Sequence, residues 1–214
     1  PTRRWTRPHA ENLDLLREQH GTALMDAAIA AGRGVIIAAP HHGNWELLNQ
    51  WLAWRTRLAI LYRPPESEVV EHFLNLVRAH HEEPGSEERV PQVRAEGPAI
   101  AQLFKRLNDG GVVGILPDQQ PKAGDGEFAP FFGVQALTMT LLGRLASRTG
   151  ATVLFAWCER IDTHAGHPGF ALHLHAAPEA VSDPDPKVAV AALNAAVEAI
   201  ARRDPAQYQW TYKR

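Results

Sequence analysis

The chain has 214 residues, of which 45% are hydrophobic, so it can bury one sizeable core and is expected to form a single domain. Its 22 basic and 24 acidic residues give a formal net charge of −2, which offers no electrostatic reason to expect nucleic acid as a partner. A single cysteine, Cys158, excludes an internal disulfide, and no apolar run approaches the roughly 18 residues that a membrane span needs.

Helix-like and strand-like segments alternate along the chain. Leucine and methionine recur at helical spacing over residues 12–31, and this pattern stops near Gly32, as a helix would. Short apolar runs bounded by Pro or Gly predict buried strands. The further predicted elements are, in order, strand 35–39, helix 45–54, strand 58–62, helix 69–79, a polar mobile loop over 80–97, helix 99–107, strand 112–116, a Gly/Pro-rich loop over 117–135, helix 137–148, strands 152–157 and 170–175, and helix 188–203.

This alternation predicts an α/β fold with a mainly parallel central sheet flanked by helices. No internal repeat or linker divides the chain, so residues 1–214 are expected to form one domain. Open α/β sheets place their chemistry at the carboxyl ends of strands. His41 and His42 follow one predicted strand, and Asp118 follows another.

The stretch GVIIAAPHHGNWELL, residues 34–48, contains the strongest candidate site. His41 and Glu46 are five positions apart, which on one continuous helix would separate them by about 140°. They can meet if His41 lies on the loop and Glu46 reaches back from the first helical turn, with Asn44 as the N-cap. A carboxylate on one ring nitrogen would fix the tautomer and leave the other nitrogen free to accept a proton. The spacing therefore fits a general base, His41, oriented by Glu46.

Two other interpretations of this stretch stay open on spacing alone. His41 can be a surface histidine beside a helix-capping glutamate. His41, His42 and Glu46 can also be metal ligands, although no metal-binding spacing stands out among the other histidines.

Five blocks of sequence, in order, resemble one family. PHHGNWELL is similar to the His-x4-acid signature of lysophospholipid-acyltransferase-like proteins, in particular the late acyltransferases of lipid A biosynthesis, with His41 and Glu46 at the signature positions. The other blocks are LYRPPESEVVEHF, GGVVGILPDQQP, FAPFFGVQALTMTLLGRLASRTGA and PAQYQWTYKR, the last with Ala206 where glutamate is common. Residues 80–97 match the family poorly.

The resemblance implies a glycerolipid-acyltransferase-like fold and a transferase that needs no cofactor. The implied reaction moves a fatty acyl group from an acyl carrier protein thioester to a hydroxyl of a lipid A precursor that carries phosphates and Kdo sugars. The implied location is the cytoplasmic face of the cell inner membrane. The N-terminal membrane-anchoring helix usual in the family is expected to be missing from this chain, which begins at Pro1.

Further residues are candidates for substrate binding. Arg63 suits a phosphate because its guanidinium can make two parallel hydrogen bonds, although a surface salt bridge is the ordinary alternative. Asp118 can orient Arg63 or a loop, or simply belong to a Pro-Asp turn. The other candidates are Asn44 at the helix start, Phe131 and Phe132 as part of an acyl-chain channel together with Phe128, and Arg55 and Arg57 in a basic or aromatic membrane patch beside His41.

Three competing functions remain. The first is transfer from acyl-CoA to another membrane glycolipid, such as a phosphoinositol mannoside, or to a lysophospholipid. The second is a metal-dependent hydrolase that uses His41, His42 and Glu46. The third is a non-catalytic lipid-binding relative that kept the fold.

Overall fold

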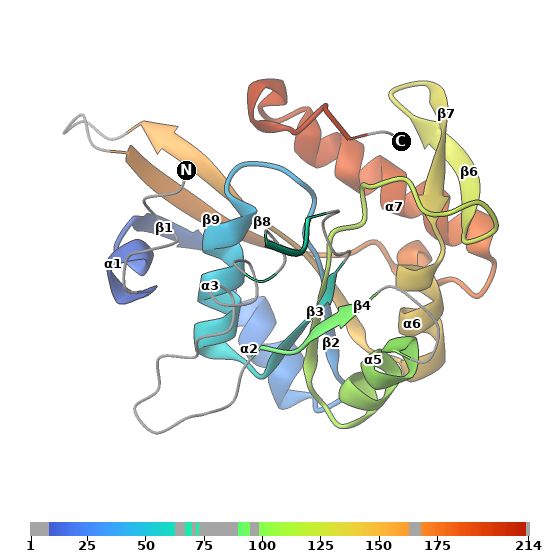
Figure 1. Ribbon diagram of the computed structural model, residues 1–214, viewed down its shortest axis with the longest axis horizontal. Coiled ribbons are helices and arrows are strands. Elements are labelled where there is room, and N and C mark those ends of the chain that lie inside the picture. Colours follow the sequence, from blue (N-terminus) through green and yellow to red (C-terminus); the bar gives the residue numbers. More distant parts are fainter. Residues whose placement is uncertain are drawn as a thin grey trace.

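A seven-stranded sheet forms the centre of the computed structural model, which describes residues 9–62, 67–69, 72, 90–94, 99–162 and 168–212 (Figure 1). Five strands are mutually parallel, and the pair at one edge runs the other way because β8 and β9 pair antiparallel. The strand order is β1 (Leu16–His20), β9 (Pro168–Ala176), β8 (Thr152–Asp162), β2 (Val35–Ala38), β5 (Val112–Ile115), β3 (Leu58–Tyr62) and β4 (Gln92–Arg94). The predicted α/β class with a mainly parallel sheet is confirmed.

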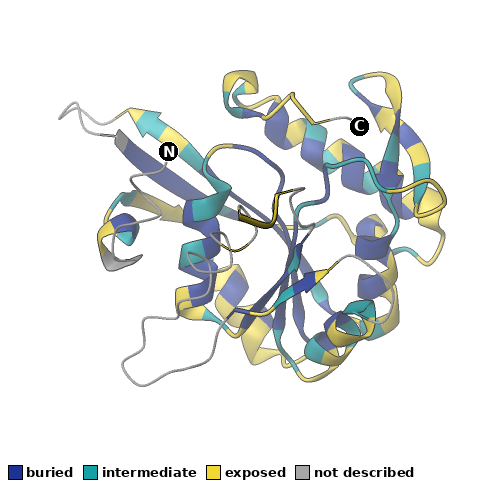
Figure 2. Ribbon diagram, in the orientation of Figure 1, coloured by how far each residue is buried: buried dark blue, intermediate teal, exposed yellow. Residues whose placement is uncertain are grey.

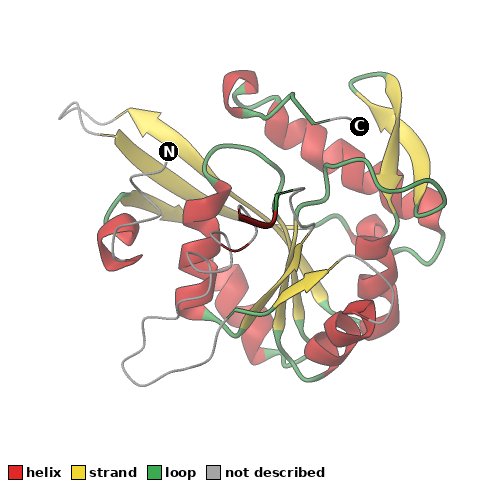
Figure 3. Cartoon of the chain, in the orientation of Figure 1, coloured by secondary structure: helices red, strands yellow, loops and turns green. Residues whose placement is uncertain are grey.

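Helices cover both faces of the sheet (Figure 3). One face packs against the short helix α1 (His9–Leu13), α2 (Thr22–Ala30) and α3 (Trp45–Arg55). The other face packs against α5 (Ala99–Asn108), α6 (Leu141–Thr149), the 3-10 turn η2 (Glu179–Ser182) and α7 (Pro186–Ala201).

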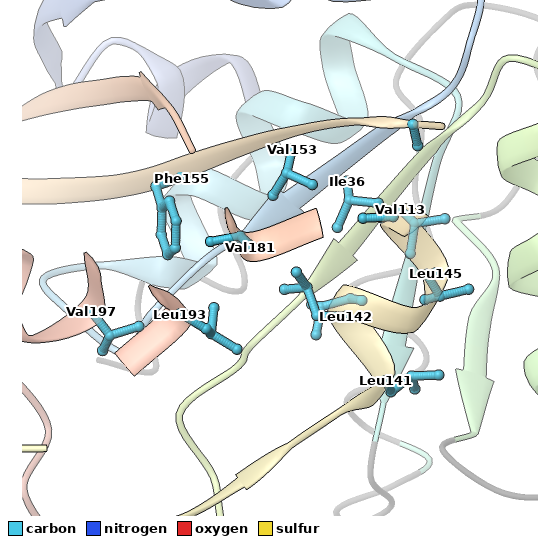
Figure 4. Close-up of a cluster of buried hydrophobic side chains, with 14 of the residues drawn as sticks. Ile36, Val113, Leu141, Leu142, Leu145, Val153, Phe155, Val181, Leu193 and Val197 are labelled. Atoms are coloured by element: carbon cyan, nitrogen blue, oxygen red, sulfur yellow. The ribbon is translucent and has the colours of Figure 1, made fainter. Parts of the chain in front are cut away.

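Strand β2 shows why the central strands are continuous apolar runs. Val35 and Ile37 contact the layer of α2 and α3, whereas Ile36 and Ala38 contact the layer of α6 and α7. Successive side chains of a strand point to opposite faces, and here both faces are buried. Figure 4 shows the second layer, in which Ile36 meets side chains of α6, α7 and the neighbouring strands.

Several elements differ from the sequence prediction. The single helix predicted over 12–31 is wrong, because edge strand β1 interrupts it and Gly21 makes the turn into α2 with φ of 75°. The apolar residues of that stretch have helical spacing, yet β1 gains a parallel partner in β9 that local pattern cannot reveal.

The loop predicted over 117–135 is also partly wrong. It contains β6 (Gly126–Phe131), which pairs antiparallel with β7 (Val134–Met139) and displaces the predicted start of α6 from residue 137 to residue 141. The predicted loop over 80–97 contains strand β4, which follows the described residues Val90 and Pro91. The rest of that range lies outside the described part of the chain, as does most of the helix predicted over 69–79.

A buried amide fixes the β6–β7 hairpin to α7. Asn194 of α7 is fully buried, its Nδ2 donates to the Ala129 carbonyl at 3.2 Å, and its Oδ1 accepts from the Thr138 hydroxyl at 3.0 Å. Phe132, at the turn, donates its backbone N–H to Glu198 at 2.6 Å. The hairpin is therefore held along its length by one helix.

We expect Asn194→Ala to loosen the hairpin selectively. The change removes two hydrogen bonds worth about 1 kcal/mol each and leaves buried partners unsatisfied. Hydrogen exchange followed by mass spectrometry should show faster exchange over residues 126–139, with strands β2 and β5 as the internal control. Equal acceleration in β2 and β5 would contradict the assignment of Asn194 as a local clamp.

Candidate active site

The predicted histidine lies where two adjacent parallel strands end. β2 and β5 are paired in register, with Ala38 opposite Ile115. His41 and Asp118 each come three residues after that pair, so the register brings them to the same level of the sheet edge. The prediction that His41 lies at the carboxyl edge of this strand is confirmed.

Asp118 holds His41 with both carboxylate oxygens. Oδ1 lies 2.7 Å from Nδ1 of the imidazole, and Oδ2 accepts from the His41 backbone N–H at 2.8 Å. The side chains are 3% and 1% exposed, so the pair is screened from water. A carboxylate only accepts hydrogen bonds, which places the proton of the neutral imidazole on Nδ1 and leaves the lone pair on Nε2.

The Nε2 side of the ring is covered in this structure. The side-chain nitrogen of Gln119 lies 3.5 Å from Nε2, and the ring of Tyr212 lies 4.5 Å from the imidazole, centroid to centroid. His41 is only 4% exposed, so its Nε2 does not face an open cleft in this structure. Gln119 and Tyr212 fell within two of the family-like blocks, but their chemical roles were not predicted.

Glu46 occupies the first turn of α3, as predicted, and is half-buried. The carboxylate on Nδ1, however, is that of Asp118 rather than Glu46. The spacing argument considered only residues near in sequence, whereas the partner is 77 positions away. Asn44 is the N-cap of α3, as predicted, and its side chain accepts from the Leu47 N–H at 3.2 Å.

The loop between β2 and α3 is fixed by backbone bonds on two sides. The Asn44 N–H donates to the Cys158 carbonyl at 2.7 Å, and the Gly43 N–H donates to the Gln207 carbonyl at 2.9 Å. The His41 carbonyl accepts from the Gln209 N–H at 2.9 Å. The segment that follows α7 is thus part of the site and pairs with the loop that carries His41.

Gly43 is required by close packing as well as by its backbone angle. Its φ is 69°, and a Cβ at this position would lie 2.0 Å from the Cys158 carbonyl oxygen. Cys158 is itself a buried residue of β8. The site depends on a backbone approach that no other residue type allows.

The other predicted binding residues are dispersed. Arg63 lies outside the described residues. Phe131 and Phe132 lie at the end of the β6–β7 hairpin, where Phe131 is buried beside Tyr208 and Phe132 packs on Trp210. Phe128, by contrast, is 65% exposed and lines no buried channel.

Arg55 and Arg57 are not beside His41. Arg55 is the last residue of α3 and Arg57 precedes β3. Both therefore lie near the amino ends of the parallel strands, whereas His41 lies at their carboxyl ends. Arg55 forms an ion pair with Asp26 at 2.7 Å. The membrane patch predicted from these two residues is therefore wrong in position.

His42 is fully buried, and neither ring nitrogen has a hydrogen-bond partner among the described residues. Burial lowers its pKa, as does the charge of Arg203, against the opposing effects of Glu159 and Asp204. Burial likewise lowers the pKa of His173, which lies 3.2 Å from Glu159. In the described part of the chain, no three His, Cys, Asp or Glu side chains converge to hold a metal, which disfavours the proposed His41, His42 and Glu46 ligand set.

The model of one protein family matches residues 3–214, nearly the whole chain. That family is the bacterial lipid A biosynthesis acyltransferases. The chain belongs to this family. Its curated relatives include a phosphatidylinositol mannoside acyltransferase of Mycobacterium tuberculosis, 29% identical over 63% of this chain and 41% of the relative. A protein of the same name from Mycolicibacterium smegmatis is 26% identical over 69% and 46%.

A lipid A biosynthesis acyltransferase of Haemophilus influenzae is 23% identical over 89% of this chain and 56% of the relative. The chain thus spans about half the length of the curated relatives it matches. No helix in the described part of this family member is long and apolar enough to cross a membrane.

Gly43→Ala should destabilise the protein far more than Gly32→Ala. Both glycines have φ of 69°, but a Cβ at Gly32 would meet nothing within 4 Å. The shared backbone strain costs about 1–2 kcal/mol, and only Gly43 adds the clash with Cys158. Thermal unfolding of both variants checks this expectation. Equal melting temperatures would show that the close approach to Cys158 carries no energetic weight.

Stability should fall as the pH drops below about 6.5, the usual histidine pKa. Because the folded-state pKa values of His42 and His173 are lowered, the unfolded chain takes up protons that the folded chain does not. Stability therefore rises with pH through this window. His42→Gln should reduce the difference in melting temperature between about pH 7.5 and about pH 5.5. An unchanged difference would exclude His42 as a source of the dependence.

Proposed function

We propose that this protein transfers a fatty acyl group from a thioester to a hydroxyl of a membrane glycolipid, with His41 as the general base. The observation that supports the proposal best is the double hydrogen bond from His41 to Asp118, which leaves Nε2 as the proton acceptor. Membership of the acyltransferase family supplies the reaction class.

The proposed reaction needs no covalent enzyme intermediate, because a thioester is already activated. Nε2 removes the proton of the acceptor hydroxyl as its oxygen attacks the thioester carbonyl. The tetrahedral intermediate then collapses to the new ester, and the leaving thiolate takes the proton back from the imidazolium. Asp118 stabilises that imidazolium with its negative charge, at a buried position where the interaction is weakly screened.

The N-terminus of α3 is the proposed source of oxyanion stabilisation. It begins directly after the loop that carries His41, and a helix start carries a partial positive charge. We assign to Glu46, in the same turn, a role in positioning the acceptor, since Asp118 already binds Nδ1. Asn44, Arg63, Phe131 and Phe132 remain proposed substrate contacts, Arg63 toward phosphate and the two phenylalanines toward the acyl chain.

The proposed donor is an acyl–acyl carrier protein, and the proposed acceptor is a Kdo-bearing lipid A precursor at the cytoplasmic face of the inner membrane. The phosphatidylinositol mannoside acyltransferases are more similar in sequence to this chain, at 29% and 26% identity against 23%. A phosphorylated mannoside lipid is therefore the second candidate acceptor. Both carry sugar hydroxyls and phosphate, so the same site chemistry serves either one.

Replacement of either member of the dyad should remove most of the rate. We expect His41→Ala to lower kcat by about 10²–10⁴-fold, because no other group takes the proton. Asp118→Asn should cost nearly as much, because its amide has one acceptor oxygen for the two N–H groups that the carboxylate now binds. Glu46→Gln should cost less and raise KM more than it lowers kcat. Turnover of acyl carrier protein thioester or acyl-CoA, with each candidate acceptor, provides the measurement.

Melting temperatures must accompany these rates, since a variant that unfolds also loses activity. Lys105→Ala, at an exposed ion pair on α5, serves as a matched charge-removal control. Wild-type kcat in a folded His41→Ala variant would refute the mechanism. A Glu46→Gln loss as large as that of His41→Ala would instead assign the catalytic carboxylate to Glu46.

A further inference from the structure

The β6–β7 hairpin is apolar on both sides. Its inner side, with Ala129, Phe131 and Ala136, is buried in the layer that contains α7. The opposite side carries Phe128 paired with Leu137, and Val134 lies next to the turn. Phe128 is 65% exposed on this outer side, and Val134, which pairs with Phe131 and so shares its side of the ladder, is 70% exposed at the end of the hairpin. Exposed residues of the hairpin are yellow in Figure 2.

The segment after α7 extends this apolar area toward the active site. Trp210, 52% exposed, packs edge-on against Phe132 with ring centroids 5.3 Å apart. Two residues later, Tyr212 is 39% exposed and covers His41. Figure 1 shows the C-terminal end of the chain beside the hairpin. We call Phe128, Phe132, Val134, Trp210 and Tyr212 the hairpin–tail surface.

Two N–H groups of this surface already donate hydrogen bonds within the protein. The Trp210 indole N–H donates to the Pro205 carbonyl at 2.8 Å, and the Phe132 N–H donates to Glu198. Arg202 lies 4.5 Å from the Phe132 ring and is paired with Glu198. The exposed part of the Trp210 ring is therefore carbon without an unmet hydrogen bond, which favours an apolar partner over water.

The surface also differs from the other exposed apolar residues. Trp54, on α3, is 62% exposed, but it lies near the end of α3 remote from His41. Single exposed apolar side chains are ordinary. This group, in contrast, contains the Phe132–Trp210 ring contact and reaches His41 through Tyr212, and exposed apolar residues gathered beside a reaction site indicate an interaction surface.

We infer that the hairpin–tail surface enters the boundary between head groups and acyl chains of a lipid bilayer and brings His41 to lipid substrates. The inference rests on the proposed function, because an enzyme that acylates a membrane glycolipid has to reach that lipid at the bilayer. Exposed Trp and Phe on a rigid element suit this boundary. An acidic carrier protein would need facing cations, and none of the five residues is charged.

Binding to vesicles of phosphatidylethanolamine and phosphatidylglycerol tests this inference. We expect the double variant Phe128→Ser and Val134→Ser to lower the partition of the purified protein into flotation fractions by roughly ten- to hundredfold, from the apolar area removed. Trp54→Ser is the matched control and should partition like the wild type. Activity of the double variant on acceptor dispersed in detergent should match that of the wild type, since neither residue is part of the proposed site.

Quenching of tryptophan fluorescence by brominated phospholipid supplies a second readout. Trp210→Phe should remove a large part of the quenching, whereas Trp54→Phe should leave it unchanged. Unchanged partition of the double variant, with quenching that Trp210→Phe does not lower, would overturn the inference. So would a wild-type dimer in sedimentation that the double variant dissociates, since a second copy would then cover the surface. Reduced partition of the double variant, together with no acyl transfer by the wild-type protein, would support the membrane contact of the hairpin–tail surface and refute the proposed function.

Discussion

One carboxylate organises the proposed reaction centre. Asp118 accepts hydrogen bonds from the backbone and from the side chain of the same histidine, and both partners are almost fully buried. Holding both N–H groups fixes the position of His41 and the direction of its ring together. It also selects the tautomer, because a buried carboxylate beside an imidazole nitrogen favours a proton on that nitrogen. The free lone pair on Nε2 follows from this choice.

The rest of the fold determines where that carboxylate lies. β2 and β5 are in register, so their following loops leave the sheet at the same level, and both strands are buried between two helical layers. The close contact between Gly43 and β8 and the pairing of residues 207–209 with the same loop restrain His41 from the other side. The segment that restrains the loop also carries Trp210 and Tyr212. The hairpin–tail surface and the base are therefore linked through one short stretch of chain.

The sequence predicted the sheet, most of its helices and the position of His41, because buried strands and N-capped helices have strong local patterns. It did not predict the partner of His41. Glu46 is near in sequence and chemically suitable, but which carboxylate reaches Nδ1 depends on strand order, and strand order is a non-local property. β1 and the hairpin were missed for a related reason. Pairing with β9 overrides the helical spacing of residues 16–20, and the residues of β6 include glycine and proline, which are typical of loops. The need for glycine at position 43 likewise arises from β8, a strand more than a hundred residues away.

The protonation state of the His41 ring is the most direct test of this account. Nitrogen NMR of histidine-labelled protein, at a pH where the ring is neutral, distinguishes a protonated from an unprotonated ring nitrogen, and His41→Gln assigns the signals. The account predicts a proton on Nδ1, none on Nε2, and the loss of this preference in Asp118→Asn. A neutral His41 with its proton on Nε2 in the wild-type protein would contradict it, because that ring could not accept a proton from the acceptor hydroxyl.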